Sequence, residues 1–163
     1  MRLMRSDLTW NSVFPLAIVL ASVPAGARAE TILDSRIDFQ GPVSLKIGSG
    51  SADVSIKSIY NTGTNPSGSL RIQVWAVQAA KSGKSPDIQG YKVAEIYTKD
   101  LSGGADVLGP NQSFDDLDLH LKFRPPTDPT YTSYVLVLEE RFANCSRPDH
   151  YCGDAYVNVA PSG

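Results

Sequence analysis

The sequence predicts an all-β protein, built as an antiparallel sandwich or barrel of seven or eight short strands. Two observations predict this class. Apolar and polar residues alternate with period two in most segments, which is the signature of strands, and no stretch keeps a helical period over three turns. Between these segments lie clusters of Gly, Pro, Asn and Asp, the residues that favour turns.

The first 29 residues have the pattern of a cleaved secretory signal peptide. Arg2 and Arg5 give a positive start, a short apolar run follows, and Ala27 and Ala29 form a small-residue cleavage site. The apolar run is shorter than the ~20 residues that a membrane-spanning helix needs, which weighs against an uncleaved anchor. We therefore expect a signal peptide over residues 1–29 and a single β-sandwich domain over residues 30–163.

The first expected strands occupy the segment that ends near Val77. Residues 30–40 are either a loose leader or a first edge strand, and SLKIG is a short candidate. In ADVSIKSIYN the apolar Val54 and Ile56 alternate with polar residues. The segment SLRIQVWAV has an apolar face and a mixed face that contains Trp75. The overlapping stretch VWAVQAAKSG could also be read as helical, but we interpret it as a strand that runs into a loop.

The later segments continue the pattern. YKVAEIYT and AYVNVA are short candidates, and FDDLDLHLKF is the clearest strand because every second residue from Leu117 to Phe123 is apolar. YVLVLEER is apolar on both faces up to Glu139, which is typical of a central buried strand. The last residues, APSG, are expected to be frayed.

One part of the sequence resembles a known kind of module. The stretch VSIKSIYNTGTNPSGSLRIQVWAV resembles the opening of immunoglobulin-like sandwich modules of secreted bacterial proteins, including the cell-adhesion-related domain that accompanies many exported enzymes. The shared features are a strand that ends in Asn61-Thr62-Gly63 and a following strand with an aromatic residue, Trp75. The resemblance covers about residues 53–140. It implies an immunoglobulin-like antiparallel β-sandwich with a binding, spacing or adhesion role.

Cys145 and Cys152 are the only cysteines, in the segment CSRPDHYCG. An exported protein enters an oxidising compartment where two thiols usually pair, and Pro148 and Asp149 favour a turn between them. A zinc site needs more Cys and His ligands than this segment supplies. A redox motif would place two residues between the cysteines rather than six. We therefore predict a structural disulfide in preference to a metal or redox site.

Few residues could carry chemistry. His120 and His150 are the only histidines, and no Gly-x-Ser-x-Gly elbow occurs. The cluster Asp115–Asp118 offers the oxygen ligands that calcium prefers, but it lacks the spacing and the glycine of a calcium loop. We expect no catalytic residue, no metal ligand and no cofactor. The alternative is a small secreted metal-binding protein or hydrolase that uses His120, His150 and this cluster.

Trp75 and Tyr151 are the candidate ligand-binding residues, because Trp and Tyr rings could stack on sugar rings, and tyrosines are also enriched at interfaces with partners. The competing interpretation of Trp75 is a core aromatic, since sandwiches often place one on such a strand. Its phase, opposite to the apolar face of its strand, keeps both interpretations open. Further tyrosines could join a surface cluster: Tyr91, Tyr97, Tyr131 and Tyr134.

Charge and composition limit the partners. Loss of the signal peptide, with its three arginines and one aspartate, changes the formal net charge from −2 to −4. Nucleic acid is not expected because clustered Lys and Arg are missing, and no segment after residue 29 is apolar enough to span a membrane. The sequence predicts a periplasmic or extracellular, non-catalytic binding or interaction module whose partner is a protein or a glycan. A subunit of a surface fibre is a further alternative.

Overall fold

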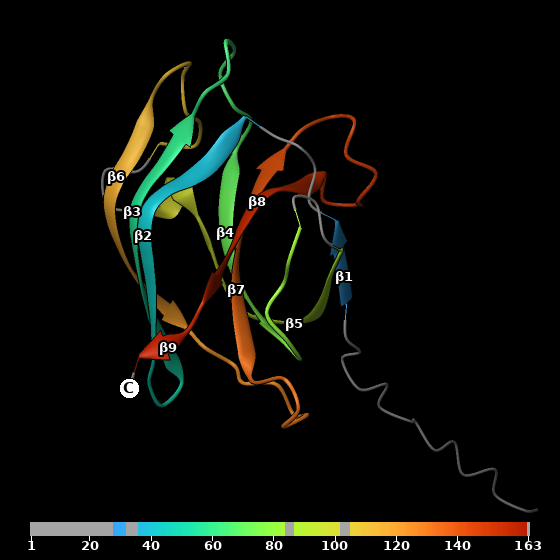
Figure 1. The fold of residues 1–163 in the computed structure, drawn as a ribbon. Helices are drawn as coiled ribbons and strands as arrows, with labels where there is room; N and C mark the ends of the chain where they lie inside the picture. Colours follow the sequence, from blue (N-terminus) through green and yellow to red (C-terminus); the bar gives the residue numbers. More distant parts are fainter. Residues whose placement is uncertain (1–27, 32–35, 84–86, 102–104, 163) are drawn as a thin grey trace, which may run out of the picture.

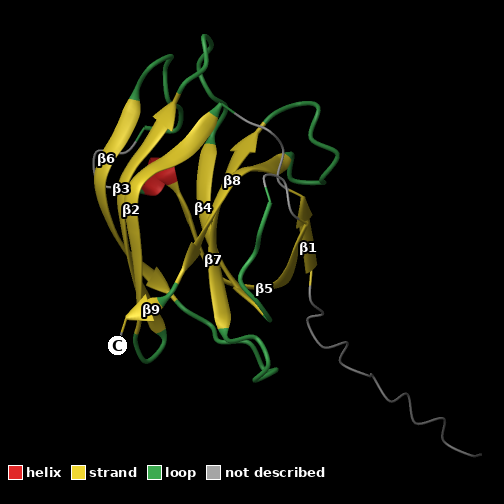
Figure 2. Cartoon of the chain, viewed as in Figure 1, coloured by secondary structure: helices red, strands yellow, loops and turns green. Residues whose placement is uncertain are grey.

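The computed structural model describes residues 28–31, 36–83, 87–101 and 105–162. These residues form two facing β-sheets and one turn of 3-10 helix at Thr98–Asp100 (Figures 1 and 2). The expected all-β antiparallel sandwich is confirmed. Among these residues no helix has the length and apolar character needed to cross a membrane. The predicted signal peptide falls almost entirely outside the described ranges.

One sheet has five strands in the order β1-β5-β4-β7-β8, and the other has four in the order β6-β3-β2-β9. The first contains β1 (Arg28–Thr31), β5 (Asp87–Tyr97), β4 (Leu70–Val77), β7 (Ser133–Arg141) and β8 (Tyr151–Val159). The second contains β6 (Ser113–Lys122), β3 (Ser51–Asn61), β2 (Ile37–Ile47) and the two-residue β9 (Pro161–Ser162). Neighbouring strands are antiparallel except β2 and β9, which run parallel.

The segments with period two form strands with one buried face. In β3, Ala52, Val54 and Ile56 are at most 1% exposed, and the residues between them face solvent. In β6, Leu119 and Leu121 point inward while the residues between them are exposed. Burial of one such apolar side chain contributes about 1.5–3 kcal/mol, so the alternation decides which face turns toward the other sheet.

The main core lies between the two sheets. Its largest fully buried side chains include Leu45 of β2, Ile59 of β3 and Ile72 of β4. The expectation that YVLVLEER forms a central buried strand is confirmed, because β7 lies between β4 and β8 and the residues from Val135 to Leu138 are completely buried.

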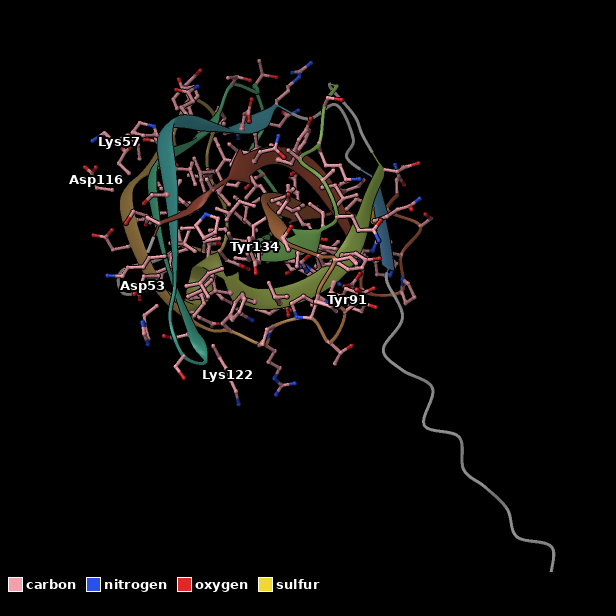
Figure 3. All side chains as sticks on the ribbon, turned by 60° about the horizontal axis from the view of Figure 1, so that its bottom comes forward. Asp53, Lys57, Tyr91, Asp116, Lys122 and Tyr134 are labelled. Atoms are coloured by element: carbon pink, nitrogen blue, oxygen red, sulfur yellow. A yellow bond between two sulfur atoms is a disulfide. The ribbon has the colours of Figure 1, made fainter. Side chains whose placement is uncertain are left out.

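The five-stranded sheet is also covered on its outer face, which the sequence did not lead us to expect. Every residue of β4 is buried. The sheet curls so that β1 comes close to β8 as well as pairing with β5 (Figure 3). Inside this curl lies a second, smaller apolar cluster: Trp75, Val77, Ile88, Val135 and Val137. The side chain of Trp75 therefore points away from the main core and is nevertheless buried, in this second cluster.

The strand β2 is longer than the candidate SLKIG. It begins at Ile37 and continues through a β-bulge, at which the register with β3 shifts between Gln40 and Val43. Gly41, inside the bulge, has a φ of +77°, a conformation that glycine adopts without the clash a side chain would make. Residues 30–40 thus hold the end of β1 and the start of β2.

The expectation that the segment APSG is frayed is wrong for Pro161 and Ser162, and Gly163 lies outside the described residues. After β8 the chain crosses to the other sheet, where Pro161 and Ser162 pair with Leu45 and Lys46 of β2. Backbone pairing at this corner joins the two sheets. The stretch VWAVQAAKSG is confirmed as a strand followed by a loop, because β4 ends at Val77.

Candidate functional site

A polar groove opens at one end of the sandwich, beside the loop that joins β3 to β4. Its volume is about 370 Å³. The β3–β4 loop forms one wall, the end of β7 and part of β8 form another, and Arg36 lies at its side. Loops held at the end of a rigid sandwich are common sites of binding, so this groove is the strongest candidate site in the described part of the chain.

Asn61, the last residue of β3, fixes the β3–β4 loop. Its buried side chain donates from Nδ2 to the backbone carbonyls of Asn65 (2.9 Å) and Leu108 (3.1 Å). Its Oδ1 accepts a hydrogen bond from the amide of Gly63 (2.8 Å), which makes an Asx turn. The loop is therefore tied both to itself and to the segment before β6, and the wall of the groove is preformed.

Asp154 supplies a buried carboxylate to the groove. The register between β7 and β8 shifts at this point, because Leu138 pairs with Ala155 whereas Glu139 pairs with Gly153. Asp154 is the extra residue of this bulge. A bulge re-aims the side chain of the strand that carries it. Here it allows Asp154 to line the groove while remaining only 6% exposed.

Glu140, near the end of β7, supplies the second carboxylate of the groove. Its Oε1 accepts a hydrogen bond from the amide of Gly68 in the β3–β4 loop. A side chain at Gly68 would collide with β7, since its Cβ would lie 1.9 Å from the carbonyl oxygen of Arg141. The absence of a side chain thus lets the loop approach the strand closely enough for this bond. The ring of Phe142 adds an apolar part to the lining.

The lining of the groove combines two carboxylates, one guanidinium and one aromatic ring, from Glu140, Asp154, Arg36 and Phe142. Carboxylates make their strongest hydrogen bonds to charged donors, and an aromatic face attracts a cation. The groove therefore suits a ligand group that is positively charged or rich in hydroxyl groups.

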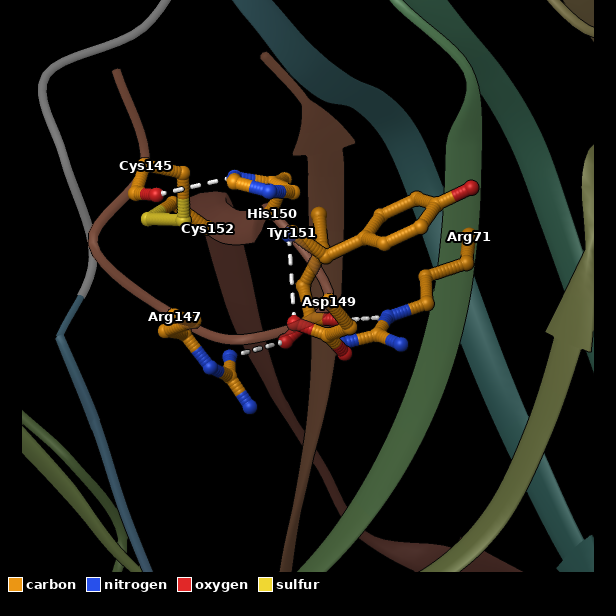
Figure 4. Close-up of a disulfide and its surroundings, with 8 residues drawn as sticks. Arg71, Cys145, Arg147, Asp149, His150, Tyr151 and Cys152 are labelled. Carbon is orange, nitrogen blue, oxygen red and sulfur yellow. Dashed lines mark hydrogen bonds and ion pairs between the residues drawn. A yellow bond between two sulfur atoms is a disulfide. The ribbon is translucent and has the colours of Figure 1, made fainter. Parts of the chain in front are cut away.

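The second polar feature is the loop between β7 and β8, which the predicted disulfide closes. Cys145 and Cys152 are joined, with Cα atoms 5.8 Å apart (Figure 4). Inside the loop, His150 has a φ of +60°, and its Nδ1 lies 3.3 Å from the carbonyl oxygen of Cys145. The segment CSRPDHYCG is thus a short disulfide-bonded loop, as predicted.

This loop covers a buried ion pair on the outer face of the five-stranded sheet. Arg71 of β4 binds the carboxylate of Glu139 of β7, and both side chains are at most 4% exposed. From the loop, Asp149 lies 2.8 Å from Arg71 and Arg147 lies 2.7 Å from Glu139 (Figure 4). Burial alone would lower the pKa of Arg71, but the hydrogen bonds and charges of its partners, with Glu139 the largest contributor among them, together raise that pKa.

Both predicted ligand-binding residues are buried. Trp75 is 1% exposed and Tyr151 is 8% exposed. The indole of Trp75 donates to Gln73 (2.7 Å), which donates in turn to Glu95 (2.7 Å). The ring of Tyr151 packs against the guanidinium of Arg71 at 4.2 Å. In this conformation neither ring presents an open face to a sugar.

The remaining tyrosines do not form one cluster. Their ring contacts are pairwise, with centroids 5.7 Å apart for Tyr97 and Tyr151, 4.7 Å for Tyr91 and Tyr131, and 6.2 Å for Tyr134 and Phe123. Tyr91 and Tyr134 lie toward the end of the sandwich opposite the groove (Figure 3).

The two histidines and the Asp115–Asp118 cluster do not come together in one site either. His120, on the outer face of β6, has Nδ1 2.6 Å from Asp53 of β3, and His150 belongs to the disulfide loop on the other sheet. Asp116 pairs with Lys57 at 2.6 Å (Figure 3). Among the residues that the structure describes, no three His, Cys, Asp or Glu side chains are grouped closely enough to hold a metal ion.

The other acidic residues of β6 bind serine hydroxyls. Asp118 accepts from Ser55 at 2.7 Å, and Asp115 accepts from Ser113 at 2.6 Å. Hydrogen bonds from Ser113 and Ser58 lower the pKa of Asp115. This face of the sheet is a solvated ladder of short polar contacts.

Comparison with known proteins assigns no family, since no family model matches the chain and no curated protein matches it either.

The residues that form the groove were not predicted. Glu140 follows an apolar strand and Asp154 interrupts one, in CGDAYVNVA. A lone carboxylate within a strand that is otherwise apolar or small is the signal that could have identified Asp154. Of the groove residues, Asn61 and Gly63 were singled out from sequence as part of Asn61-Thr62-Gly63, and the bond between them helps to hold the wall of the groove.

Proposed function

We propose that the protein is an exported, non-catalytic binding module of the immunoglobulin-like type, which holds a basic side chain of a protein partner in the groove beside β8. The observation that carries this proposal is the position of Asp154, a carboxylate that a β-bulge directs into the groove and that is only 6% exposed. A carboxylate makes its strongest hydrogen bonds to charged donors, so a cation that enters the groove meets a strong acceptor at this position.

The surroundings of Asp154 favour a lysine or arginine of the partner. Glu140 lies in the same groove and offers a second acceptor, and the ring of Phe142 can contact the cation or its alkyl stem. The hydrogen bonds of Asn61 hold the β3–β4 loop before any partner arrives. A preformed wall lowers the entropy lost on binding, which supports a recognition role.

Export is part of this proposal. It is supported by the signal-peptide pattern of residues 1–29 and by the disulfide between Cys145 and Cys152, since disulfides persist in oxidising compartments. The resemblance of residues 53–140 to immunoglobulin-like modules of secreted bacterial proteins supports a binding or adhesion role.

The first test is an NMR titration of the ¹⁵N-labelled exported protein with its disulfide intact. The probe is Nα-acetyl-arginine amide, and Nα-acetyl-citrulline amide is the uncharged match. We expect chemical-shift changes at Asn61–Ser67 and at Asp154 with the arginine probe only. Equal changes with both probes, or changes elsewhere, would contradict recognition of a cation in this groove. Changes there with neutral oligosaccharides alone would replace the protein partner by a glycan.

Three variants test which carboxylates bind the arginine probe. Asp154→Asn is expected to abolish the response to the arginine probe, and Glu140→Gln to weaken it, because each removes one charge from the groove. Asp53→Asn is the matched control, since Asp53 lies on the exposed face of β3 and pairs with His120. A control variant that loses as much binding as Asp154→Asn would show that the probe responds to overall charge.

A further inference from the structure

The binding groove carries opposite charges on its two sides. Arg36 immediately precedes β2 of the four-stranded sheet, whereas Glu140 and Asp154 belong to β7 and β8 of the five-stranded sheet. The β3–β4 loop crosses from one sheet to the other at this end of the sandwich (Figure 1). The groove therefore has a cation on the side of one sheet and two carboxylates on the side of the other.

Contacts with the start of the β3–β4 loop fix the position of Arg36. Its carbonyl oxygen accepts hydrogen bonds from the amide of Thr62 (2.7 Å) and from the hydroxyl of Thr62 (2.9 Å). Its alkyl stem lies against Gly63, since a side chain at that glycine would bring its Cβ to 3.2 Å from Cδ of Arg36. Arg36 is also exposed, so its guanidinium is accessible to a ligand.

The carboxylates lie toward the other end of the same loop. Glu140 accepts a hydrogen bond from the amide of Gly68, and the β-bulge directs Asp154 into the groove. Residues 63–67 line the groove between the two ends. In the part of the chain that the structure describes, no ion pair joins Arg36 to either carboxylate. The opposite charges of the groove are therefore held apart.

We propose that the groove recognises the C-terminal residue of a partner polypeptide when that residue is arginine or lysine. The α-carboxylate binds Arg36, and the side-chain cation binds Asp154 and Glu140. A guanidinium can bind a carboxylate through two parallel hydrogen bonds, and capture of a terminal carboxylate is a recurring mode of peptide recognition. This inference rests on the proposed function and adds that the partner chain ends in the groove.

The separation of the charges favours a residue with a long side chain. Facing sheets of a sandwich lie about 10 Å apart. Arginine and lysine carry their cation at the end of a stem of about three or four methylene groups, well away from the α-carboxylate. The ring of Phe142 offers this stem an apolar contact. A basic residue inside a chain has no α-carboxylate and would leave Arg36 without a partner.

The test compares two probes that differ only at the C-terminus. Nα-acetyl-arginine has a free carboxylate and Nα-acetyl-arginine amide does not, and each is titrated by NMR into the exported protein with its disulfide intact. We expect the acid to bind about three- to tenfold more tightly, which is the gain from one charged hydrogen-bonded pair. Its additional chemical-shift changes are expected at Thr62 and Gly63, which contact Arg36.

Variants of Arg36 assign the preference to its charge. Arg36→Gln is expected to remove the preference for the acid without weakening binding of the amide. Arg36→Glu is expected to reverse the preference, because like charges repel. Arg124→Gln is the matched control, since Arg124 is exposed and follows β6 at the end of the sandwich away from Asn61. This control is expected to keep the preference, and amide spectra check that each variant is folded.

The outcomes separate this inference from the proposed function. If the native protein binds acid and amide equally, or if Arg36→Gln keeps the preference, recognition of a C-terminus is wrong although the groove still binds a cation. If neither probe binds, the proposed function is wrong as well. If free arginine binds more tightly than Nα-acetyl-arginine, the ligand is an amino acid and not a polypeptide, because a C-terminal residue has no free α-ammonium group.

Discussion

At the scale of single residues, Arg71 shows how far local pattern and tertiary position can diverge. Arg71, Gln73 and Trp75 alternate with apolar residues on β4, a pattern that in an isolated sheet would place them toward solvent. Here the disulfide loop and the curl of the sheet cover them, and Arg71 is satisfied by Glu139 and Asp149. A buried charge is tolerable only when its partners are also present.

We predict that removing one partner of this pair destabilises the protein more than removing both. Arg71→Met leaves Glu139 buried, where Arg147 is its remaining cation, and is expected to cost about 3–5 kcal/mol. The double variant Arg71→Met/Glu139→Leu removes both charges and is expected to recover part of that loss. Urea unfolding at equilibrium measures each free energy in a double-mutant cycle.

The exposed pair of Lys57 and Asp116 is the matched control. Their side chains are 55% and 73% exposed, so Lys57→Met is expected to destabilise the protein far less than Arg71→Met does. If Arg71→Met is as mild as this control, or if the double variant is simply additive, the pair does not act as a buried unit.

The disulfide and the phase of Trp75 were the residue-level features most open to prediction from sequence. Both follow from short-range information: the disulfide from compartment and turn residues, and the phase from alternation. The place of Asp154 in the groove was not predictable in this way. It depends on how many residues of β8 oppose β7, which is decided by pairing across the sheet and leaves little trace in the local sequence.

At the scale of elements, the disulfide loop acts as a cover for β4 and β7. Its two ends are tied by Cys145 and Cys152, and a backbone bond from Phe142 to His150 (3.0 Å) narrows it further. From this frame Arg147 and Asp149 reach the buried pair beneath. The loop therefore has a structural role, which its polar sequence, typical of an exposed loop, does not predict.

We predict that replacing both cysteines by serine destabilises the protein by roughly 2.5 kcal/mol, the value expected from the entropy of closing so short a loop. The loss is expected to be local first, with faster amide hydrogen exchange at Phe142 and His150 than in the native protein. Exchange measured by mass spectrometry, with urea unfolding in parallel, checks both effects. Unchanged exchange in the loop would mean that the ion pairs alone hold it.

The strands themselves were largely predictable because alternation of period two is a local signal and one face of each sheet meets the main core. The double burial of β4 was not. It depends on β1 approaching β8, a contact between segments more than a hundred residues apart in the chain. β9 was missed for a similar reason, since a two-residue strand carries no periodicity and forms only because β2 is already in place.

At the scale of the whole molecule, the two apolar clusters share β4. Ile72 and Val74 belong to the main core, and Trp75 and Val77 belong to the cluster inside the curled sheet. Neither cluster can lose its packing without disturbing the strand that serves the other. The sandwich and its curled sheet are therefore expected to unfold together.

The last prediction tests this coupling directly. Trp75 is the only tryptophan outside the predicted signal peptide, so tryptophan fluorescence of the exported protein reports on the smaller cluster alone. Far-ultraviolet circular dichroism reports on the strands of both sheets. We expect the two probes to give coincident urea transitions, as a two-state protein does. If fluorescence changes at a lower urea concentration, the curled part of the sheet opens separately, and the side chains of Trp75 and Tyr151 become accessible to a ligand before the main core is lost.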